Sequence, residues 1–247
     1  MTALPRDQKK QILVTGGGTG MGQSIAIAMA EIGSRVAISG RRIDKLRETA
    51  SKSKGSHEIL CHEADVTDRK SLETLFEWFD NEIGKIDCLV HAAGINVALR
   101  SMQELEPANW DQLIGINLTG TYNVLRCALP RMRAHRKGLV ILINSVAGKR
   151  SVPLGGIGYN ASKFGMSGLG IGLAEEEREN GIRITNLYPG EVNTPILEKR
   201  KNPPSEEHRS NILQSDDIAS VVSHLISLPD RVHIPELVVK PASQSFV

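Results

Sequence analysis

Thr15-Gly16-Gly17-Gly18-Thr19-Gly20-Met21-Gly22 is a glycine-rich turn that follows directly on a short apolar run at residues 11–15. Helical periodicity begins where the turn ends and continues to about residue 32. Residues without a Cβ atom allow a tight turn, and they let backbone N–H groups approach a phosphate closely. The stretch therefore predicts the strand, turn and helix that open an α/β fold. Its Gly-x-x-x-Gly-x-Gly spacing differs from the usual Gly-x-Gly-x-x-Gly pattern, so the turn alone does not identify a ligand.

Strand-like and helix-like segments alternate from residue 11 to about residue 188. The predicted strands are residues 11–15, 35–39, 58–61, 88–91, 139–144, 183–188 and 237–240. The predicted helices are residues 20–32, 43–53, 68–83, 107–134 and 159–180. This alternation predicts a single Rossmann-like, doubly wound α/β domain, with a seven-stranded, mainly parallel sheet and helices on both faces. Ligands of such folds bind at the carboxyl ends of the strands.

The length of 247 residues is sufficient for one full α/β core. We expect a polar N-terminal extension over residues 1–10 and one dinucleotide-binding and catalytic domain over residues 11–247. The polar segment 196–210, which contains Pro203-Pro204, interrupts the alternation. We interpret it as a flexible substrate flap, and the alternative is a solvated connector.

The composition is that of an ordinary soluble protein, with 40% hydrophobic residues and a formal charge of +2. This charge favours small-molecule partners over nucleic acid. The N-terminus has no apolar region of the length of a secretory signal, and no run of eighteen apolar residues occurs, so we expect a cytoplasmic protein without a membrane partner. The histidines show no metal-ligand spacing, and no metal is expected.

The end of the second predicted strand indicates which dinucleotide would bind. An acidic residue there would accept hydrogen bonds from the ribose 2′-OH of NAD, but the sequence has Ser39-Gly40-Arg41-Arg42. A guanidinium pairs well with the 2′-phosphate of NADP. NADP(H) is therefore preferred over NAD(H), with Arg41 ahead of Arg42 as the phosphate partner. The alternative is that both arginines simply begin a solvated helix.

Three polar residues indicate carbonyl chemistry. Tyr159 and Lys163 are four residues apart and share a helix face, so the ammonium would favour the ionised phenol and lower its pKa. Ser145 follows an apolar strand and is placed to hydrogen-bond a substrate oxygen. It lacks the glycines of a Gly-x-Ser-x-Gly elbow, so we expect it to orient the substrate rather than attack it. Taken singly, these residues are also compatible with a surface pair and a turn.

Together these motifs resemble the short-chain dehydrogenase/reductase family over nearly the whole chain. Residues 15–22 are similar to its Thr-Gly-x-x-x-Gly-x-Gly turn, Ala64-Asp65-Val66 to its adenine-contacting stretch, and His91-Ala92-Ala93-Gly94 to its Asn-Asn-Ala-Gly segment. Residues 189–194 are similar to the segment along the nicotinamide. The resemblance implies four catalytic residues, Asn117, Ser145, Tyr159 and Lys163. It implies a cofactor site made of Gly16, Thr19, Gly20, Met21, Gly22, Arg41, Arg42, Asp65, Val66, His91, Ala92, Gly94, Tyr159, Lys163, Pro189, Gly190, Val192 and Thr194.

The resemblance also implies roles. Tyr159 would be the acid/base, Lys163 would hold the ribose hydroxyls, and Asn117 would lie at a helix kink on a water path to Lys163. His91 departs from the family's asparagine, which affects the hydrogen bonding of that loop. The helices at 107–134 and 159–180 would form the main subunit contact of a homodimer or homotetramer.

The expected function is NADP(H)-dependent interconversion of a carbonyl and a secondary alcohol on a small substrate. One alternative is a 3-oxoacyl-[acyl-carrier-protein] reductase-like enzyme. Another, of a different class, is a non-catalytic dinucleotide-binding sensor or scaffold. Three basic residues, Arg100, Lys149 and Arg150, follow predicted strand ends and are candidates for contact with an anionic substrate.

Overall fold

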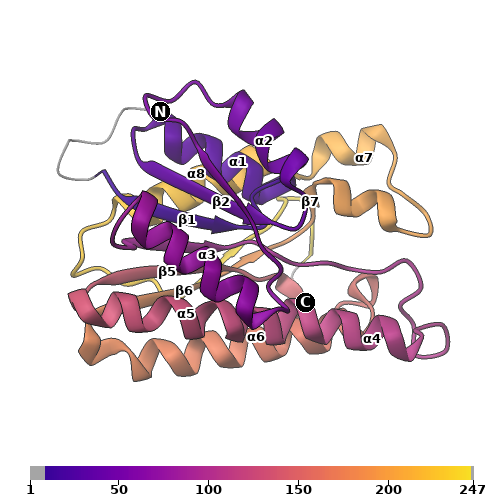
Figure 1. Ribbon diagram of the computed structural model, residues 1–247. Helices are drawn as coiled ribbons and strands as arrows, with labels where there is room; N and C mark the ends of the chain where they lie inside the picture. The colour runs from indigo at the N-terminus through magenta and orange to yellow at the C-terminus, as the bar shows by residue number, and fades with distance from the viewer. Residues whose placement is uncertain (1–8, 246–247) are drawn as a thin grey trace.

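The fold is a parallel seven-stranded sheet between two layers of helices, as the computed structural model of residues 9–245 shows (Figure 1). The strand order is β3-β2-β1-β4-β5-β6-β9, and every pairing is parallel. The order reverses between β1 and β4, which creates a crevice at their carboxyl ends. The strands are β1 (Gln11–Thr15), β2 (Arg35–Gly40), β3 (Leu60–Glu63), β4 (Cys88–His91), β5 (Gly138–Ile143), β6 (Ile182–Pro189) and β9 (Glu236–Val239).

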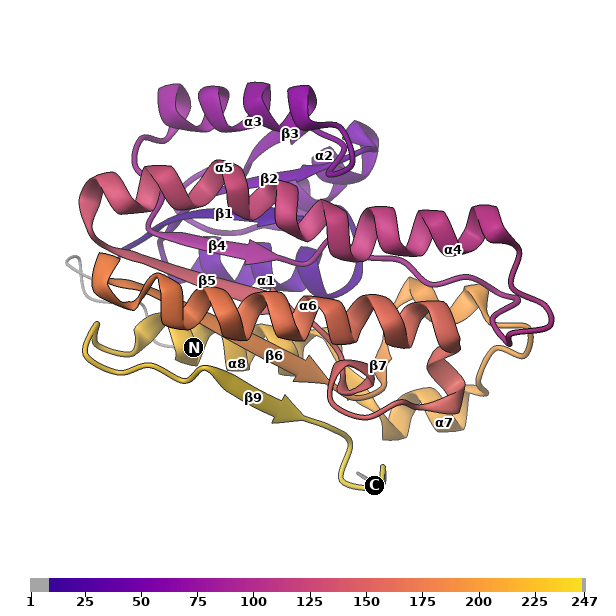
Figure 2. The ribbon, with the colours of Figure 1, turned by 90° about the horizontal axis from the view of Figure 1, so that it is seen from below.

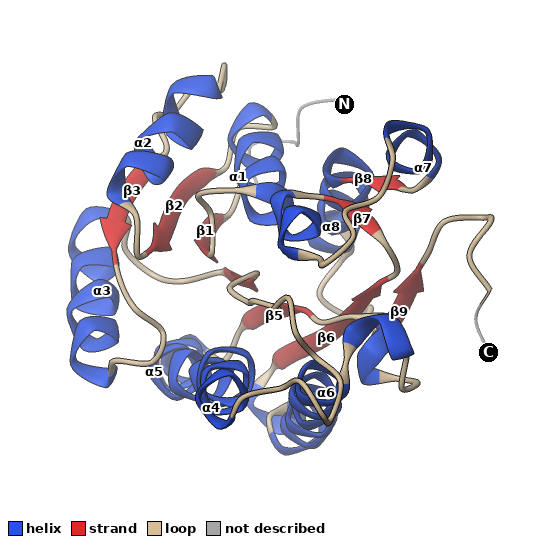
Figure 3. Ribbon diagram, turned by 90° about the vertical axis from the view of Figure 1, so that its right-hand side faces the viewer, coloured by secondary structure: helices blue, strands red, loops and turns tan. Residues whose placement is uncertain are grey.

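Alternate side chains of each central strand enter two separate cores, because successive residues of a strand point to opposite faces. In β1, Ile12 and Val14 pack against one helical layer, whereas Leu13 packs against the other. The first layer contains α1 (Gly20–Glu31), α2 (Ile43–Lys52) and α8 (Ser215–Ser227), and the second contains α3 (Arg69–Glu82), α5 (Gly120–His135) and α6 (Ile157–Glu176). Figure 3 shows the two layers on either side of the sheet. The predicted doubly wound α/β fold is confirmed.

The predicted helix at residues 107–134 consists of three consecutive segments that form one long rod beside α6 (Figure 2). They are α4 (Pro107–Ile114), the π-helical turn η2 (Gly115–Thr119) and α5. The Gly120 N–H donates to the Gly115 carbonyl, five residues earlier, which is the π-helical pattern. This irregularity lies around Asn117, where the family resemblance implied a kink.

Several elements differ from the sequence-based expectation. The strand predicted at 58–61 is β3 at Leu60–Glu63, and α6 begins two residues before Tyr159. The prediction omitted α8, a helix with a capping box between Gln214 and Asp217, and the short parallel pair β7 (Val192–Asn193) and β8 (Leu213–Gln214). It also omitted α7 (Glu206–Asn211), which lies within the segment interpreted as a flap.

The segment 196–210 continues from the short helix η6 (Pro195–Lys199) into α7 and contributes to the site described below. Most of the predicted N-terminal extension, residues 1–8, lies outside the described residues. Within residues 9–245, no helix is both long enough and apolar enough to span a bilayer.

Candidate active site

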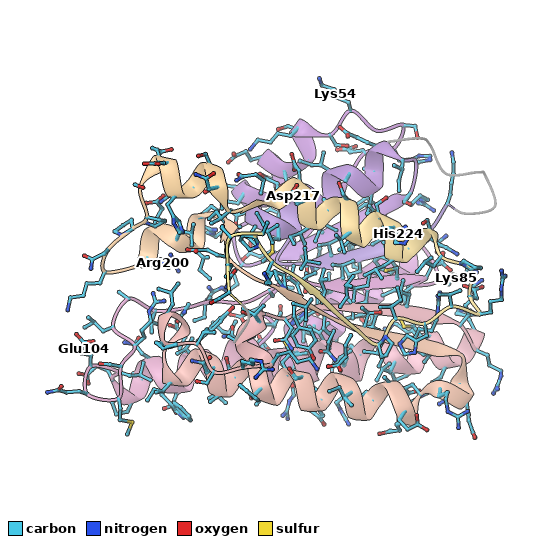
Figure 4. All side chains as sticks on the ribbon, turned by 180° about the vertical axis from the view of Figure 1, so that it is seen from behind. Lys54, Lys85, Glu104, Arg200, Asp217 and His224 are labelled. Atoms are coloured by element: carbon cyan, nitrogen blue, oxygen red, sulfur yellow. The ribbon has the colours of Figure 1, made fainter. Side chains whose placement is uncertain are left out.

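Two adjoining cavities open at the carboxyl ends of the strands. The larger, of about 460 Å³, lies over the crevice between β1 and β4, and the smaller, of about 140 Å³, lies beside it above β5 and β6. Met21, Thr194 and Ile196 line both cavities. The segment 196–210 therefore borders the junction of the two spaces. Figure 4 shows Arg200, from this segment, at one end of the molecule and Lys85 at the opposite end.

The glycine-rich turn forms a cradle that side chains would fill. A Cβ atom on Gly16, whose φ is +73°, would lie 2.7 Å from the Ala93 backbone nitrogen. A Cβ atom on Gly22 would lie 2.3 Å from the Gly16 carbonyl oxygen. Gly20, at the first position of α1, has a φ of +56°. The turn thus packs backbone against backbone and leaves the start of α1 open toward the larger cavity, an arrangement that fits a pyrophosphate.

Basic side chains line the larger cavity next to the end of β2. Arg41 and Arg42 follow β2 as predicted, and both line the cavity, together with Lys45 and Lys199. Lys45 forms an ion pair with Glu48 at 2.7 Å, whereas no ion pair involves either arginine within the described residues. Sequence reasoning missed Lys199, because its position depends on how η6 folds back over the cavity.

Most of the predicted cofactor residues line one of the two cavities. The larger is lined by Gly16, Thr19, Gly20, Met21, Gly22, Arg41, Arg42, Asp65, Val66, Ala92, Gly94 and Thr194. The smaller is lined by Ser145, Tyr159, Pro189, Gly190 and Val192. Neither set contains His91, Asn117 or Lys163, which are buried beneath the cavity surfaces.

Tyr159 and Ser145 lie together in the smaller cavity. Ser145 follows β5 and accepts a hydrogen bond from the Ala147 N–H at 3.1 Å, which fixes its hydroxyl at the cavity wall. Burial raises the pKa of Tyr159, and a hydrogen bond with Ser145 and the charge of Arg100 act in the opposite direction. The expected lowering of the phenol pKa by Lys163 is therefore wrong for this structure, because desolvation is the larger effect.

Lys163 lies on the same helix face as Tyr159, but its ammonium points into the protein. Its Nζ atom is 5.8 Å from the centre of the Tyr159 ring and donates to the Ile143 carbonyl at 3.1 Å. The residue is 3% exposed, and burial lowers its pKa to about 7. No carboxylate forms an ion pair with it within residues 9–245. It can therefore change protonation state near neutral pH.

Asn117 is fully buried and holds the loop that follows β4. Its side-chain oxygen accepts from the Ile95 N–H at 2.8 Å, and its amide nitrogen donates to the Ile95 carbonyl at 3.0 Å and to the Ser162 hydroxyl at 3.0 Å. A residue in a π-helical turn thereby connects this loop to α6. In this geometry Asn117 is a positioning residue.

His91 bridges two hydroxyl groups from different elements. Its Nδ1 lies 2.7 Å from the Thr15 hydroxyl and its Nε2 lies 3.0 Å from the Thr121 hydroxyl. Thr121 donates its own proton to the Asn117 carbonyl at 2.7 Å, so Nε2 must carry the proton that Thr121 accepts. Burial, followed by the charge of Lys163, lowers the pKa of His91 to about 3. A neutral imidazole therefore joins the ends of β1 and β4 to the first turn of α5.

Of the three basic residues predicted to meet an anionic substrate, one lines the smaller cavity. Arg100 belongs to its wall. Lys149 instead forms an ion pair with Glu236 and lies 5.0 Å from the Tyr188 ring centre. Arg150 lines neither cavity. The three residues therefore do not form one group, because Lys149 is held by Glu236 of β9 and the chain returns to the cavity wall at Val152, after Arg150.

Comparison with known proteins agrees with this arrangement. The profile of the short chain dehydrogenase family matches residues 10–204. An uncharacterized oxidoreductase of Listeria innocua is 33% identical, covering 97% of this chain and 99% of its own. An alcohol dehydrogenase from the archaeon Thermococcus sibiricus, solved with 5-hydroxy-NADP, is 26% identical with a TM-score of 0.84, covering 95% of this chain and 97% of its own.

A serine dehydrogenase solved with NADP⁺ is likewise 26% identical, with a TM-score of 0.86 over 95% of this chain and 96% of its own. The protein therefore belongs to the short-chain dehydrogenase family, and it is an oxidoreductase of that class.

Proposed function

We propose that the protein is an NADP(H)-dependent oxidoreductase that interconverts a carbonyl and a secondary alcohol on a small substrate. The observation that carries this proposal is the junction of the two cavities. The phosphate turn and two arginines line one cavity, Ser145 and Tyr159 line the other, and Met21 and Thr194 line both. A dinucleotide in the larger space would thus present its reactive ring where the hydroxyl groups lie.

The chemistry assigned to this chain is proton transfer and charge stabilisation. When bound, the reduced nicotinamide supplies a hydride to the carbonyl carbon. Tyr159 then donates its phenolic proton to the carbonyl oxygen, and Ser145 hydrogen-bonds the same oxygen as negative charge develops on it. The raised pKa of Tyr159 keeps the phenol protonated at neutral pH, which suits the direction of carbonyl reduction.

Lys163 has the protonation behaviour needed to restore that proton. Its pKa of about 7 lets the amine gain and lose a proton near neutral pH at little free-energy cost. Its Nζ atom lies 5.8 Å from the centre of the Tyr159 ring, so its charge can act on the phenol, and a bound cofactor would be held beside it. Asn117 contributes to this arrangement by donating to the hydroxyl of Ser162, which precedes Lys163 on α6.

Cofactor preference is assigned to the end of β2. Arg41 and Arg42 line the larger cavity, and no acidic residue of β2 stands where a ribose 2′-OH would be held. A 2′-phosphate would pair with a guanidinium in a charge-assisted, bidentate geometry. The thermococcal and serine dehydrogenase structures contain a bound NADP form, which agrees with this assignment.

The two alternatives make different demands on the site. A 3-oxoacyl thioester reductase has to admit a long acyl carrier arm, and a third cavity of about 540 Å³, which shares Arg100, Leu154 and Arg200 with the smaller one, is where such an arm would have to lie. A non-catalytic sensor has no need for a serine and a tyrosine hydroxyl at the cavity junction. The pair of hydroxyls favours an enzyme over a sensor, and activity toward thioesters separates the two kinds of reductase.

Replacing Tyr159 with phenylalanine tests the proposal. Carbonyl reduction is followed as loss of NADPH absorbance across a panel of ketones, oxo acids and 3-oxoacyl thioesters, with NADH in parallel. We expect the wild type to prefer NADPH. We expect Tyr159→Phe to lower kcat by about 100- to 10,000-fold, because the proton donor is lost. NADPH affinity, measured by fluorescence titration, should change little.

Tyr122→Phe is the matched control, because Tyr122 lies on α5 with 43% of its surface exposed. It should turn over at the wild-type rate. Undiminished turnover by Tyr159→Phe would remove Tyr159 from its role, and the absence of NADPH oxidation with every compound would favour the sensor.

A further inference from the structure

Charged side chains in the wall of the smaller cavity indicate what kind of substrate it takes. Three residues of that wall are charged: Arg100, Glu191 and Arg200. The other lining groups are apolar or neutral, and they include the hydroxyls of Ser145 and Tyr159. The question is which of the three charges is still available to a ligand.

Arg200 and Glu191 neutralise each other. Arg200 Nη1 binds one carboxylate oxygen of Glu191 in an ion pair, and His208 Nε2 lies 2.8 Å from the other oxygen. Both partners of the ion pair are largely buried, with side chains 16% and 13% exposed. These contacts outweigh burial and hold the pKa of Glu191 below its usual range, so the carboxylate stays ionised. Neither group is available to bind a substrate charge without breaking this cluster.

Arg100 has no such partner. Its Nη1 donates to the Leu154 carbonyl at 2.8 Å and its Nε to the Ala98 carbonyl at 3.4 Å, and no carboxylate forms an ion pair with it anywhere in residues 9–245. Burial and then the charge of Arg200 lower its pKa. A partly desolvated cation beside a second cation is therefore left without a counter-charge in the cavity wall.

The backbone around Arg100 is built to hold it there. Its carbonyl accepts a hydrogen bond from the Ile157 N–H at 3.1 Å, at the first residue of α6. Gly156, just before that helix, has a φ of +76°, and a Cβ atom on it would lie 2.4 Å from the Arg100 Cβ. The helix that carries Tyr159 is thus fixed directly to Arg100, and both residues line the smaller cavity.

We propose that the substrate is a small oxo acid, or the corresponding hydroxy acid, whose carboxylate binds Arg100 while its carbonyl oxygen lies between Ser145 and Tyr159. This inference rests on the function proposed above. A guanidinium is the side chain best matched to a carboxylate, because its N–H groups form a rigid fork.

The charge of the substrate also affects the acid/base residue. Arg100 lowers the pKa of Tyr159 through its positive charge. A carboxylate bound to Arg100 neutralises that charge, so the phenol holds its proton more firmly when the oxo acid is present. Binding of the correct substrate would therefore favour the protonated form of Tyr159 that reduction consumes.

Matched pairs of substrates test the proposal. Acetoacetate and levulinate are each compared with the corresponding primary amide, which keeps the carbonyl and the length but lacks the charge. We expect kcat/KM for the acids to exceed that for the amides by roughly 10- to 100-fold in the wild type, as expected for a charge-assisted pair in a partly buried site. Arg100→Gln should remove this preference by lowering kcat/KM for the acids alone.

Two further variants separate the role of Arg100 from general effects. Arg100→Lys keeps the positive charge but lacks the forked N–H groups of the guanidinium, so it should recover part of the preference for acids over amides. Lys85→Gln, at an exposed position at the opposite end of the molecule where the lysine pairs with Asp87, makes the same change in net charge and should keep the preference unchanged. An equal loss for acids and amides in Arg100→Gln, or equal rates for both in the wild type, would overturn the inference and leave the reductase function standing.

A binding measurement covers the case in which no compound is turned over, which would count against the proposed function itself. Levulinate is titrated by calorimetry into the protein saturated with NADPH. Binding that is lost in Arg100→Gln and retained in Lys85→Gln would uphold the carboxylate site. Absence of binding to the wild type, or equal binding to both variants, would reject it.

Discussion

His91 shows how one buried side chain couples pH to stability. The imidazole is fully buried between Thr15 and Thr121, and its pKa is lowered to about 3 from an ordinary value of 6.5. Between these two values the unfolded chain binds a proton that the folded protein does not. The stability contributed by the neutral histidine is therefore present above pH 6.5 and is lost as the pH falls toward 3.

Replacing His91 with asparagine should remove this acid sensitivity. Between pH 7 and pH 4.5, the histidine accounts for a loss of about 2–3 kcal/mol in the free energy of unfolding, so His91→Asn should lose about that much less than the wild type. Urea unfolding at the two pH values measures the difference. His57→Asn, at an exposed site, is the control and should follow the wild type. Parallel losses in all three proteins would contradict the assignment.

For individual residues, the sequence predicted which side chains lie close together, but not how deeply they are buried or what else they contact. The spacing of Tyr159 and Lys163 correctly placed both on one helix face. It could not show that Lys163 turns toward Ile143 or that burial dominates the pKa of both groups, because desolvation depends on side chains from distant elements. The cavity position of Arg100 depends in the same way on a loop packing against the start of α6.

At the scale of the elements, the π-helical turn η2 determines how the start of α5 packs against the wall of the larger cavity. The turn brings Gly120 against Val66, which lines that cavity, and a Cβ atom on Gly120 would lie 2.6 Å from the Val66 side chain. At the other end of the turn, a Cβ atom on Gly115 would have no atom within 4 Å. Two glycines five residues apart thus have opposite surroundings.

Alanine at these two positions should have opposite effects. Gly120→Ala forces the stiff Val66 side chain to move and should lower the free energy of unfolding by about 1–3 kcal/mol, with weaker NADPH binding. Gly115→Ala adds a methyl group in open space and gains helix propensity, so it should raise stability by up to about 1 kcal/mol. Chemical denaturation and NADPH titration provide the measurements. Similar effects at both sites would mean that the turn is not closely packed.

The elements predicted best are those whose local hydrophobic pattern specifies them without contacts from distant parts of the chain. Strand β5 is an uninterrupted apolar run, and the helix predicted at residues 68–83 is α3, which Asp68 caps by accepting from the Lys70 and Ser71 N–H groups. Helix α8 was missed although its buried residues recur at helical spacing and Gln214 and Asp217 form a capping box. The polar, proline-containing segment before α8 interrupted the pattern of strands and helices, so this helical spacing was not recognised. Edge strand β3 was displaced because only one neighbour fixes its register.

At the scale of the whole molecule, the outer surface of α5 and α6 exposes large apolar side chains. Tyr122, Phe164 and Ile171 are 43%, 44% and 48% exposed, and added Cβ atoms on Gly168 and Gly172 would have nothing within 4 Å. The two helices lie side by side on one flank of the sheet (Figures 2 and 3). We propose that this apolar face joins subunits in a homodimer or homotetramer, as the family resemblance implies.

A charge in the centre of this face should separate the subunits. Phe164→Glu is expected to convert an oligomer into a monomer at micromolar concentration, because a carboxylate would be buried without a partner. Light scattering coupled to size-exclusion chromatography measures the mass. Thr74→Glu adds the same charge to an exposed site on α3 and should remain oligomeric. A monomeric wild type, or an unchanged mass for Phe164→Glu, would rule out this face.

The C-terminal strand has a practical consequence. β9 pairs with β6, and the chain then returns so that Gln244 lines the smaller cavity and accepts a hydrogen bond from the Glu191 N–H at 3.0 Å. Through Glu191 this contact reaches the ion pair with Arg200. Substitution of Gln244 would therefore disturb both the wall of the smaller cavity and the Glu191–Arg200 ion pair, although Gln244 follows the last strand of the sheet.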